Sequence, residues 1–324
     1  MSTESIEEPG SVGEAELASA QEFRRQVALA VTDAVEVRKE LLDLVLVCIA
    51  AEGHILIEDL PGVGKTTLAR SVARALDLQF ARVQCTADLL PADVVGTNVF
   101  NQREGRFEFR PGPIFANVVL VDEINRASPK TQSGLLECMQ ERNVTVDVHT
   151  HELARPFIVL ATQNPIEFEG TYPLPEAQVD RFMARVSMGY PSAGGEVAML
   201  RAHETTDRVD QIEPVATAAD LLAVEDAARR VHASDALRGY VVSLLQHTRQ
   251  DKRAELGASP RAGLLLLRAA KARALLLGRD HALPDDVQAL AETVLAHRIV
   301  LAPEAVDTTG ERIVADALAA TPAL

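Results

Sequence analysis

The segment Ile55–Thr67 constrains the fold of this chain more than any other part of it. Its first residues, Ile55–Ile57, form a short apolar run of the kind that makes a buried parallel strand. A turn rich in proline and glycine follows, and Lys65 and Thr66 then open a run with helical spacing. A strand, a glycine turn and a helix that begins with Lys-Thr are the layout of a nucleotide phosphate site. An ordinary strand–turn–helix connection is the alternative, and the helix that follows favours the phosphate site.

The residue types in this turn suit the binding of an anion. Glycines let backbone N–H groups crowd around a phosphate without a Cβ in the way, and the helix N-terminus adds donors and a partial positive charge. Lys65 can reach the β- and γ-phosphates of a nucleotide, and the hydroxyl of Thr66 can bind Mg²⁺. We expect nucleotide contacts from a continuous series of residues: Gly62, Val63, Gly64, Lys65, Thr66 and Thr67.

One position departs from the usual G-x-x-x-x-G-K-[ST] pattern. Asp59 stands where the first glycine is expected. A carboxylate this close to a phosphate has to point away from it or cap a backbone amide. The sequence leaves open whether Asp59 tunes turnover or caps the turn.

The composition limits the classes of partner. The length of 324 residues favours about two domains, and 47% hydrophobic residues suffice for sizeable cores. A net charge of −15, 4% aromatic residues and the absence of tryptophan argue against a general nucleic-acid or anionic-membrane surface. Cys48, Cys85 and Cys138 show neither metal nor disulfide spacing, so we expect reduced thiols. The acidic, serine-rich start is unlike a signal peptide and the most apolar run is too short to span a bilayer, so we expect a soluble cytoplasmic protein.

The pattern along the chain predicts a parallel α/β domain followed by a smaller all-helical domain. Residues 1–19 are small, polar and acidic and are expected to be disordered, and residues 20–190 form the α/β domain. Within it, buried strands are predicted at 55–57, 81–85, 118–121 and 157–161. Residues 195–324 are rich in alanine and leucine, and helices are predicted at 195–204, 217–231, 234–250, 259–277 and 284–297.

Two β-hairpins are predicted within the α/β domain. The first consists of Gly96–Phe100 and Arg106–Phe109, inside an insert near residues 88–109. The second lies around Val144–Val148, where apolar and polar residues alternate. The pattern alone does not decide whether the first hairpin has a role or is a plain surface feature.

Acidic and amide side chains follow two of the predicted strands. Asp122 and Glu123 directly follow the apolar run VVLV, and Asn164 follows a later apolar run. Functional groups in open parallel sheets sit at the carboxyl ends of strands. Asp122 could therefore share the Mg²⁺ of Thr66, and Glu123 could polarise an attacking water. Asn164 could hydrogen-bond that water or the γ-phosphate, although, taken alone, an Asn-Pro turn is the favoured interpretation.

Four separated segments together resemble a MoxR-type AAA+ ATPase: PGVGKTTLAR, VLVDEINRASPKTQSGLLECMQE, ATQNPIEFEGTYPLPEAQVDRFM and GASPRA. The resemblance covers nearly the whole chain from Ala20 onward. It implies an AAA+ P-loop sheet flanked by helices, a helical lid, and ATP with Mg²⁺ bound between subunits of a ring, usually a hexamer. It also implies that the hairpin near residues 88–109 is an insertion in the second helix that faces the substrate side of the ring.

The resemblance assigns roles to individual residues. Lys65 and Thr66 match the phosphate and Mg²⁺ residues, which agrees with the chemistry of the turn. Asp122 matches the metal-binding acid, Glu123 matches the catalytic acid and Asn164 matches sensor 1.

Arginines supply the remaining roles that the resemblance implies. Arg181, in VDRF, is similar to the arginine finger that reaches a neighbouring subunit's γ-phosphate, although a salt bridge with Asp180 or Glu176 is the alternative. Arg126 is a second candidate for such a contact. Arg261 matches sensor 2 of the lid. It follows a serine and a proline that favour a helix start, and a cation in the first turn opposes the helix dipole unless an anion binds nearby.

The function implied by the resemblance is an ATP-driven ring with a chaperone-like role. Relatives are thought to remodel or mature protein complexes, or to help them acquire metal cofactors, beside a partner with a von Willebrand factor A-like domain. One alternative is a motor that acts on nucleic acid, which the acidity of the chain disfavours. Another is a nucleotide-gated scaffold with little hydrolysis, for which Asp59 would be relevant. A small-molecule kinase fits the motifs least well.

Overall fold

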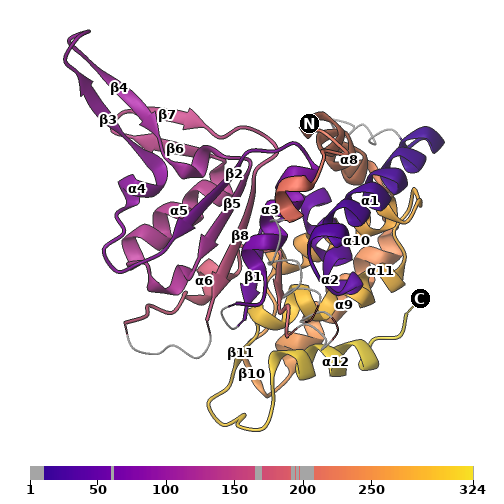
Figure 1. Cartoon of the computed structure of the whole chain (residues 1–324). Coiled ribbons are helices and arrows are strands. Elements are labelled where there is room, and N and C mark those ends of the chain that lie inside the picture. The colour runs from indigo at the N-terminus through magenta and orange to yellow at the C-terminus, as the bar shows by residue number, and fades with distance from the viewer. Residues whose placement is uncertain are drawn as a thin grey trace, which may run out of the picture.

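A computed structural model of the chain describes residues 11–59, 62–164, 170–190 and 208–323, together with the single positions 194 and 197. Its centre is a parallel sheet of five strands in the order β2-β5-β8-β1-β9 (Figure 1). The strands are β1 (Ile55–Glu58), β2 (Phe80–Gln84), β5 (Val118–Asp122), β8 (Ile158–Gln163) and β9 (Ala184–Val186). The predicted parallel α/β fold is confirmed.

Alternate residues of the strands face two different cores. Leu120 of β5 belongs to the core on one face of the sheet, whereas Val119 and Val121 belong to the core on the other face. Every residue of β5 is buried, because helices cover both faces of a parallel sheet. β9 was not predicted, since its three residues are too few to show a strand pattern.

Helices from both sides of the sequence cover the sheet. α1 (Glu14–Ala34), α2 (Lys39–Ala50) and α3 (Lys65–Ala75) share the core of one face, which also includes the helices after residue 208. α5 (Pro129–Glu141) and the short α4 (Pro91–Val95) share the core of the other face. A further short helix, α6 (Glu176–Val179), precedes β9.

The start of α1 corrects one prediction. Residues 14–19 were expected to belong to a disordered tail, but α1 begins at Glu14. Acidic residues in a first turn favour the helix dipole, and Glu16 also accepts a hydrogen bond from the backbone N–H of Gly13 at 3.0 Å. Arg230, more than two hundred positions away, donates to the Glu16 carboxylate at 3.2 Å, and such a partner cannot be found from local composition. Residues 1–10 of the expected tail lie outside the described residues.

Both predicted hairpins are present. β3 (Gly96–Asn101) pairs with β4 (Arg106–Pro111), and β6 (Asn143–Val146) pairs with β7 (His149–Glu152). The β3–β4 hairpin projects far from the sheet, with β6–β7 beside its base (Figure 1). The two hairpins contact each other, because the rings of Phe109 and His151 stack with centroids 3.9 Å apart.

The chain after residue 208 is mainly helical, as predicted. Its helices are α8 (Ala218–Arg230), α9 (Asp235–Gln250), α10 (Pro260–Leu276), α11 (Pro284–Leu295) and α12 (Gly310–Ala320). Residues 208–323 are called the helical region below. The helix expected at 195–204 falls outside the continuously described ranges. α12 and the small pair of strands β10 (Ala254–Leu256) and β11 (Val300–Leu301) were not predicted.

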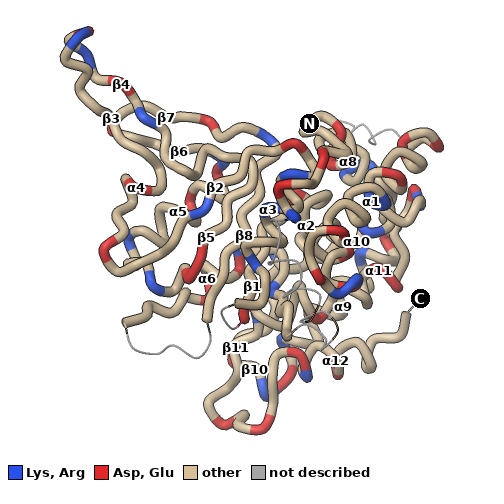
Figure 2. Tube along the Cα trace, viewed as in Figure 1, with Lys and Arg blue, Asp and Glu red and all other residues tan. Residues whose placement is uncertain are grey.

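Charged positions are distributed over the whole molecule. Figure 2 shows Lys and Arg interspersed with Asp and Glu in both the α/β part and the helical region.

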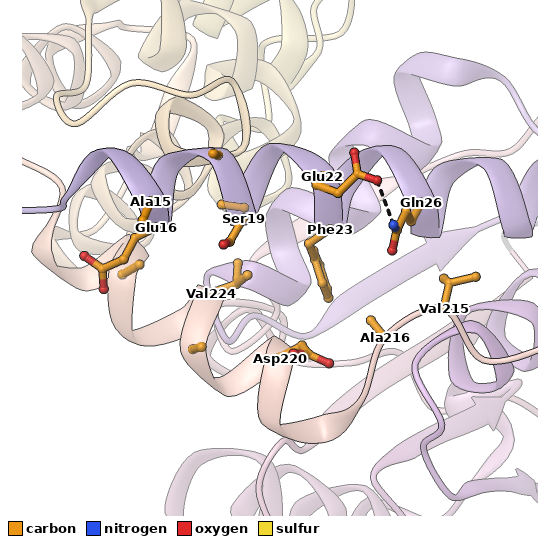
Figure 3. Close-up of a pocket in the computed structure, with 14 residues that line it drawn as sticks. Ala15, Glu16, Ser19, Glu22, Phe23, Gln26, Val215, Ala216, Asp220 and Val224 are labelled. Atoms are coloured by element: carbon orange, nitrogen blue, oxygen red, sulfur yellow. Dashed lines mark hydrogen bonds between the residues drawn. The ribbon is translucent and has the colours of Figure 1, made fainter.

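A groove of about 630 Å³ lies between α1 and α8, where small side chains such as Ala15 and Ser19 leave space beside Phe23 and Val224 (Figure 3). Within the described residues, no helix is both long and apolar enough to cross a membrane.

Candidate nucleotide site

The turn between β1 and α3 is called here the phosphate loop (residues 59–66), and its described glycines have the backbone conformation that suits an anion site. Gly62 has φ 87°, and Gly64, the N-cap of α3, has φ 93°. These left-handed conformations favour glycine over residues with a Cβ. A Cβ on Gly64 would meet no atom closer than 3.9 Å, so backbone conformation rather than space explains this glycine. Val63 is buried, while Thr66 and Thr67 are half-buried in the first turn of α3.

Lys65 is the first residue of α3 and lies near the end of the phosphate loop. Its Nζ donates a hydrogen bond to the backbone carbonyl of Asp59 at 3.0 Å. Burial lowers the pKa of Lys65, while the carboxylates of Asp59, Asp122 and Glu123 act in the opposite direction. Lys65 is therefore within electrostatic reach of Asp122, the last residue of β5, and of Glu123, which follows it.

Asp59 caps backbone amides instead of facing the phosphate position. Its buried Oδ2 accepts hydrogen bonds from the backbone N–H of Met188 and, at 3.1 Å, from that of Gly189. The hydroxyl of Ser187 donates to the same oxygen at 3.2 Å. Asp59 thus ties the phosphate loop to the turn that follows β9, and the carboxylate points away from the loop.

Residues of neighbouring strands hold Asp122, the last residue of β5, and Glu123, which follows it. Asp122 is buried at the end of β5 and accepts hydrogen bonds from Arg82 Nε at 2.6 Å and from the Thr162 hydroxyl at 3.2 Å. Glu123 follows in a left-handed conformation with φ 54°, and its backbone N–H donates to the Thr162 hydroxyl at 2.9 Å. Non-glycine residues in this conformation concentrate at functional sites. Thr162 therefore fixes the acid pair from β8.

The side chain of Glu123 points across the same edge of the sheet. Its Oε2 accepts a hydrogen bond from Gln84 of β2 at 3.1 Å and one from Arg126 at 3.1 Å. Arg126, the second candidate for a contact with a neighbouring subunit, thus lies beside Glu123 of its own chain. Asn164 comes directly after β8, half-buried at this same carboxyl edge.

Three residues of this site were missed from the sequence: Arg82, Gln84 and Thr162. Arg82 and Gln84 are exposed residues at the carboxyl end of β2, and Thr162 is buried near the end of β8. Polar residues at the carboxyl ends of predicted parallel strands are the signal that could have identified them. Which of them meet also depends on the order of the strands, which the sequence does not state.

The other two predicted arginines lie at the opposite, amino edge of the sheet. Arg181 precedes β9, and two residues later the backbone N–H of Met183 donates to the carbonyl of His54, just before β1. Arg261 lies in the first turn of α10, with its Nε 4.0 Å from Asp180 Oδ2. Its Nη1 donates to Gln140, near the end of α5, at 3.4 Å. Arg181 and Arg261 are therefore near each other and remote from the phosphate loop of the same chain.

Comparison with known proteins identifies the same two parts of the chain. Residues 54–184 match the model of the ATPase family associated with various cellular activities (AAA), and residues 246–317 match the AAA lid domain. The chain is 40% identical over 295 residues to Chaperone MoxR1 of Mycobacterium tuberculosis, covering 88% of this chain and 78% of that protein. It is 33% identical over 310 residues to Protein MoxR of Methylorubrum extorquens, with 88% of each chain covered.

Two further relatives extend the comparison. Protein YeaC of Bacillus subtilis, itself uncharacterized, is 49% identical over 268 residues, covering 83% of this chain and 84% of that protein. The crystal structure of a candidate ATPase from Cytophaga hutchinsonii has a TM-score of 0.90 and 38% identity, over 96% of this chain and 98% of that chain. The phosphate loop and the acid pair lie in the matched AAA segment, and Arg261 lies in the matched lid segment. The chain therefore belongs to the MoxR family of AAA+ ATPases.

Proposed function

We propose that this ATPase binds ATP with Mg²⁺ at the carboxyl edge of its sheet and hydrolyses it with arginines from a neighbouring copy of the chain. One observation carries the proposal. Lys65 and the acid pair lie at the carboxyl edge, whereas Arg181 and Arg261 lie together at the amino edge. A single copy holds both halves of a hydrolysis site but does not bring them together. Head-to-tail association would join the halves, and such contacts close into rings.

The residues at the carboxyl edge fit ATP and Mg²⁺. The glycine turn and the start of α3 offer backbone donors, and Lys65 is the cation that would contact the β- and γ-phosphates. Thr66 and Asp122 supply a hydroxyl and a buried carboxylate, which are ligands suited to Mg²⁺ when phosphate oxygens and waters complete its shell. Bound Mg²⁺ would offset negative charge on the phosphoryl oxygens.

Glu123 would orient the attacking water and accept its proton. Gln84 and Arg126 both donate to Oε2, so among the described contacts Oε1 is the oxygen left to face the water. Thr162 holds the backbone of Glu123 in its left-handed conformation and so fixes the direction of the side chain. Asn164 would hydrogen-bond the water or the γ-phosphate from the end of β8.

Arginines from the adjoining copy would complete the site. Arg181 would stabilise charge on the γ-phosphoryl group, and Arg261 would contact the nucleotide from the same surface. This arrangement gives a physical reason for a homo-oligomer, and the family suggests a hexameric ring. The name of the relative Chaperone MoxR1 supports a chaperone-like role, and we propose that the client is a protein complex that the ring remodels or matures. A separate partner with a von Willebrand factor A-like domain, and a role in metal insertion, are further proposals from the family.

Phosphate release measured over a range of protein concentrations tests this function. We expect the rate per chain to rise as the protein assembles, with assembly followed by light scattering on the same samples. A rate per chain that is as high in the monomeric protein as in the assembled protein would contradict a shared site. Binding of ATP without measurable phosphate release in the assembled protein would instead favour a nucleotide-gated scaffold.

A further inference from the structure

The loop that carries Arg181 is held by one buried arginine of the helical region. Arg298 lies in the short 3-10 helix η4 (Ala296–Arg298), and its side chain is 2% exposed. Its Nε donates to Asp180 Oδ1 at 2.7 Å, and its Nη2 donates to the backbone carbonyls of Asp180 at 3.2 Å and of Phe182. A longer contact of 3.4 Å reaches the carbonyl of Met183. One guanidinium therefore hydrogen-bonds to the backbone on both sides of Arg181.

The carboxylate of Asp180 is directed to the helical region rather than to Arg181. Besides Arg298, it accepts a weak hydrogen bond from the hydroxyl of Ser259, the N-cap of α10, at 3.4 Å. Arg261 lies 4.0 Å away on its other side. Within the described part of the chain, the side chain of Arg181 has no ion pair or side-chain hydrogen bond. The salt bridge between Arg181 and Asp180 that the sequence left open is therefore not formed.

These contacts have a consequence for the position of Arg181. Arginine presents five donors in a rigid planar fork, so it can fix several acceptors in one geometry at once. Its charge also neutralises Asp180, which would otherwise be an adjacent carboxylate able to attract Arg181. Arg298 also donates to the carbonyl of Val294 in α11, so the same guanidinium links the loop to the helical region.

We propose that Arg298 is a positioning residue for Arg181, through which the helical region of one copy controls hydrolysis at the nucleotide site of the next. Arg298 holds residues 180–183 against η4 and keeps Asp180 away from Arg181, so that Arg181 is free to reach across an interface. This inference rests on the proposed function, because it assumes that Arg181 acts on a neighbouring copy.

Substitution of Arg298 by methionine is the first test. We expect the turnover number to fall about tenfold to a hundredfold, as for a misplaced catalytic group. The ATP concentration for half-maximal rate should stay unchanged, since the phosphate loop is intact. Arg298→Lys should recover only part of the rate, because an ammonium can pair with Asp180 but cannot span the carbonyls as well. Wild-type turnover in Arg298→Met would overturn the proposal.

Mixing with Lys65→Ala separates positioning from a structural defect. Lys65→Ala copies carry an intact Arg181 and Arg298 but a defective phosphate loop. Added to Arg298→Met copies, they should restore hydrolysis, because they supply a correctly positioned Arg181 to the intact phosphate loops. An absence of rescue, while Arg181→Ala is rescued in the same assay, would overturn the role of Arg298 and leave the proposed function standing. If Arg181→Ala is not rescued in mixed assemblies either, the proposed function itself fails.

Two further variants keep the proposal testable if Arg298→Met does not fold. Asp180→Asn changes a residue whose side chain is 21% exposed and preserves its shape, so it should fold, lose part of the turnover and be rescued in the same way. Wild-type turnover in this variant would count against the proposal. Arg273→Met is the matched control, since Arg273 pairs with the buried Asp286 inside the helical region. Arg273→Met should lower the stability of the fold, and mixing with Lys65→Ala should not raise its turnover. If mixing with Lys65→Ala restores a lost turnover in Arg273→Met, the specific role of Arg298 is overturned.

Discussion

Asp59 shows at the scale of one residue how a departure from a motif can serve structure. It replaces a glycine of the usual phosphate loop, yet its carboxylate faces the amides of Met188 and Gly189. Its backbone carbonyl holds Lys65. The residue therefore joins Lys65 to the turn after β9.

Replacement of Asp59 by alanine should lower the free energy of unfolding by about 1–3 kcal/mol, because two backbone amides lose their acceptor. Asp59→Asn keeps one acceptor oxygen, so its free energy of unfolding should fall by less. Urea unfolding of the three proteins measures the difference. Equal midpoints for Asp59→Ala and the wild type would show that these hydrogen bonds do not stabilise the fold.

Replacement of Glu123 by glutamine should leave ATP binding intact and slow hydrolysis by about 10²-fold or more, because the proposed general base is removed while the shape of the side chain is kept. Equilibrium binding of ATP and phosphate release together measure the two effects. Glu137→Gln makes the same charge change at an exposed position of α5 and should hydrolyse ATP normally. Near-normal turnover in Glu123→Gln would mean that another group activates the water.

At the scale of elements, local signals predict most of the structure. The helices α8, α9 and α10 begin where the sequence places a threonine or serine cap, and each cap side chain accepts a hydrogen bond from the third residue after it. α12 has the same signal, since Thr309 caps it, but it was not predicted. The strand β9 is too short to be visible as a pattern, and the true start of α1 depends on a partner in α8.

The site shows the same limit on sequence reasoning. Lys65, Asp122 and Glu123 were predicted because each directly follows a strand or a glycine turn. Arg82 and Thr162 were not, because their role depends on which strands lie beside β5. The pairing of Arg298 with Asp180 joins residues 118 positions apart and has no local signature.

A buried acid at the contact between α8 and the α/β part gives a prediction about pH. Glu225 of α8 pairs with Arg155, which precedes β8, at 3.1 Å. A second carboxylate lies nearby, surrounded by four arginines: Glu52, with Arg142, Arg155, Arg229 and Arg268. Burial and the charge of Glu52 raise the pKa of Glu225 to about 7.

The direction of the pH effect follows from this raised pKa. Between the ordinary value of 4.5 and about 7, the folded protein holds a proton that the unfolded chain has released. Stability should therefore fall as pH rises through this window, by up to about 3 kcal/mol. Glu225→Gln should remove this component, while Asp226→Asn at the exposed neighbouring position should keep it. Urea unfolding from pH 5 to pH 8 measures it, and a wild-type profile in Glu225→Gln would refute the assignment.

At the scale of the whole molecule, the fold places its phosphate loop at one edge of the sheet and Arg181 and Arg261 at the opposite edge. The helical region contacts the amino edge through Asp180, and α1 and α2 share its core. A change in the helical region would therefore reach Arg181 through the contact between Arg298 and Asp180. In the proposed assembly, each copy would bind one nucleotide at its own phosphate loop and would supply Arg181 to the nucleotide site of the next copy.

The measurement that tests this central claim most directly is ATP hydrolysis by a mixture of Lys65→Ala and Arg181→Ala. Alone, Lys65→Ala should fail to bind ATP, and Arg181→Ala should bind ATP but hydrolyse it about 10³-fold more slowly or worse. In mixed assemblies, confirmed by differently tagged copies that co-purify, Arg181→Ala copies provide intact phosphate loops and Lys65→Ala copies provide Arg181. We predict a rate for the mixture well above the sum of the two separate rates. A mixture that forms mixed assemblies and is no faster than that sum would contradict a site shared between neighbouring copies.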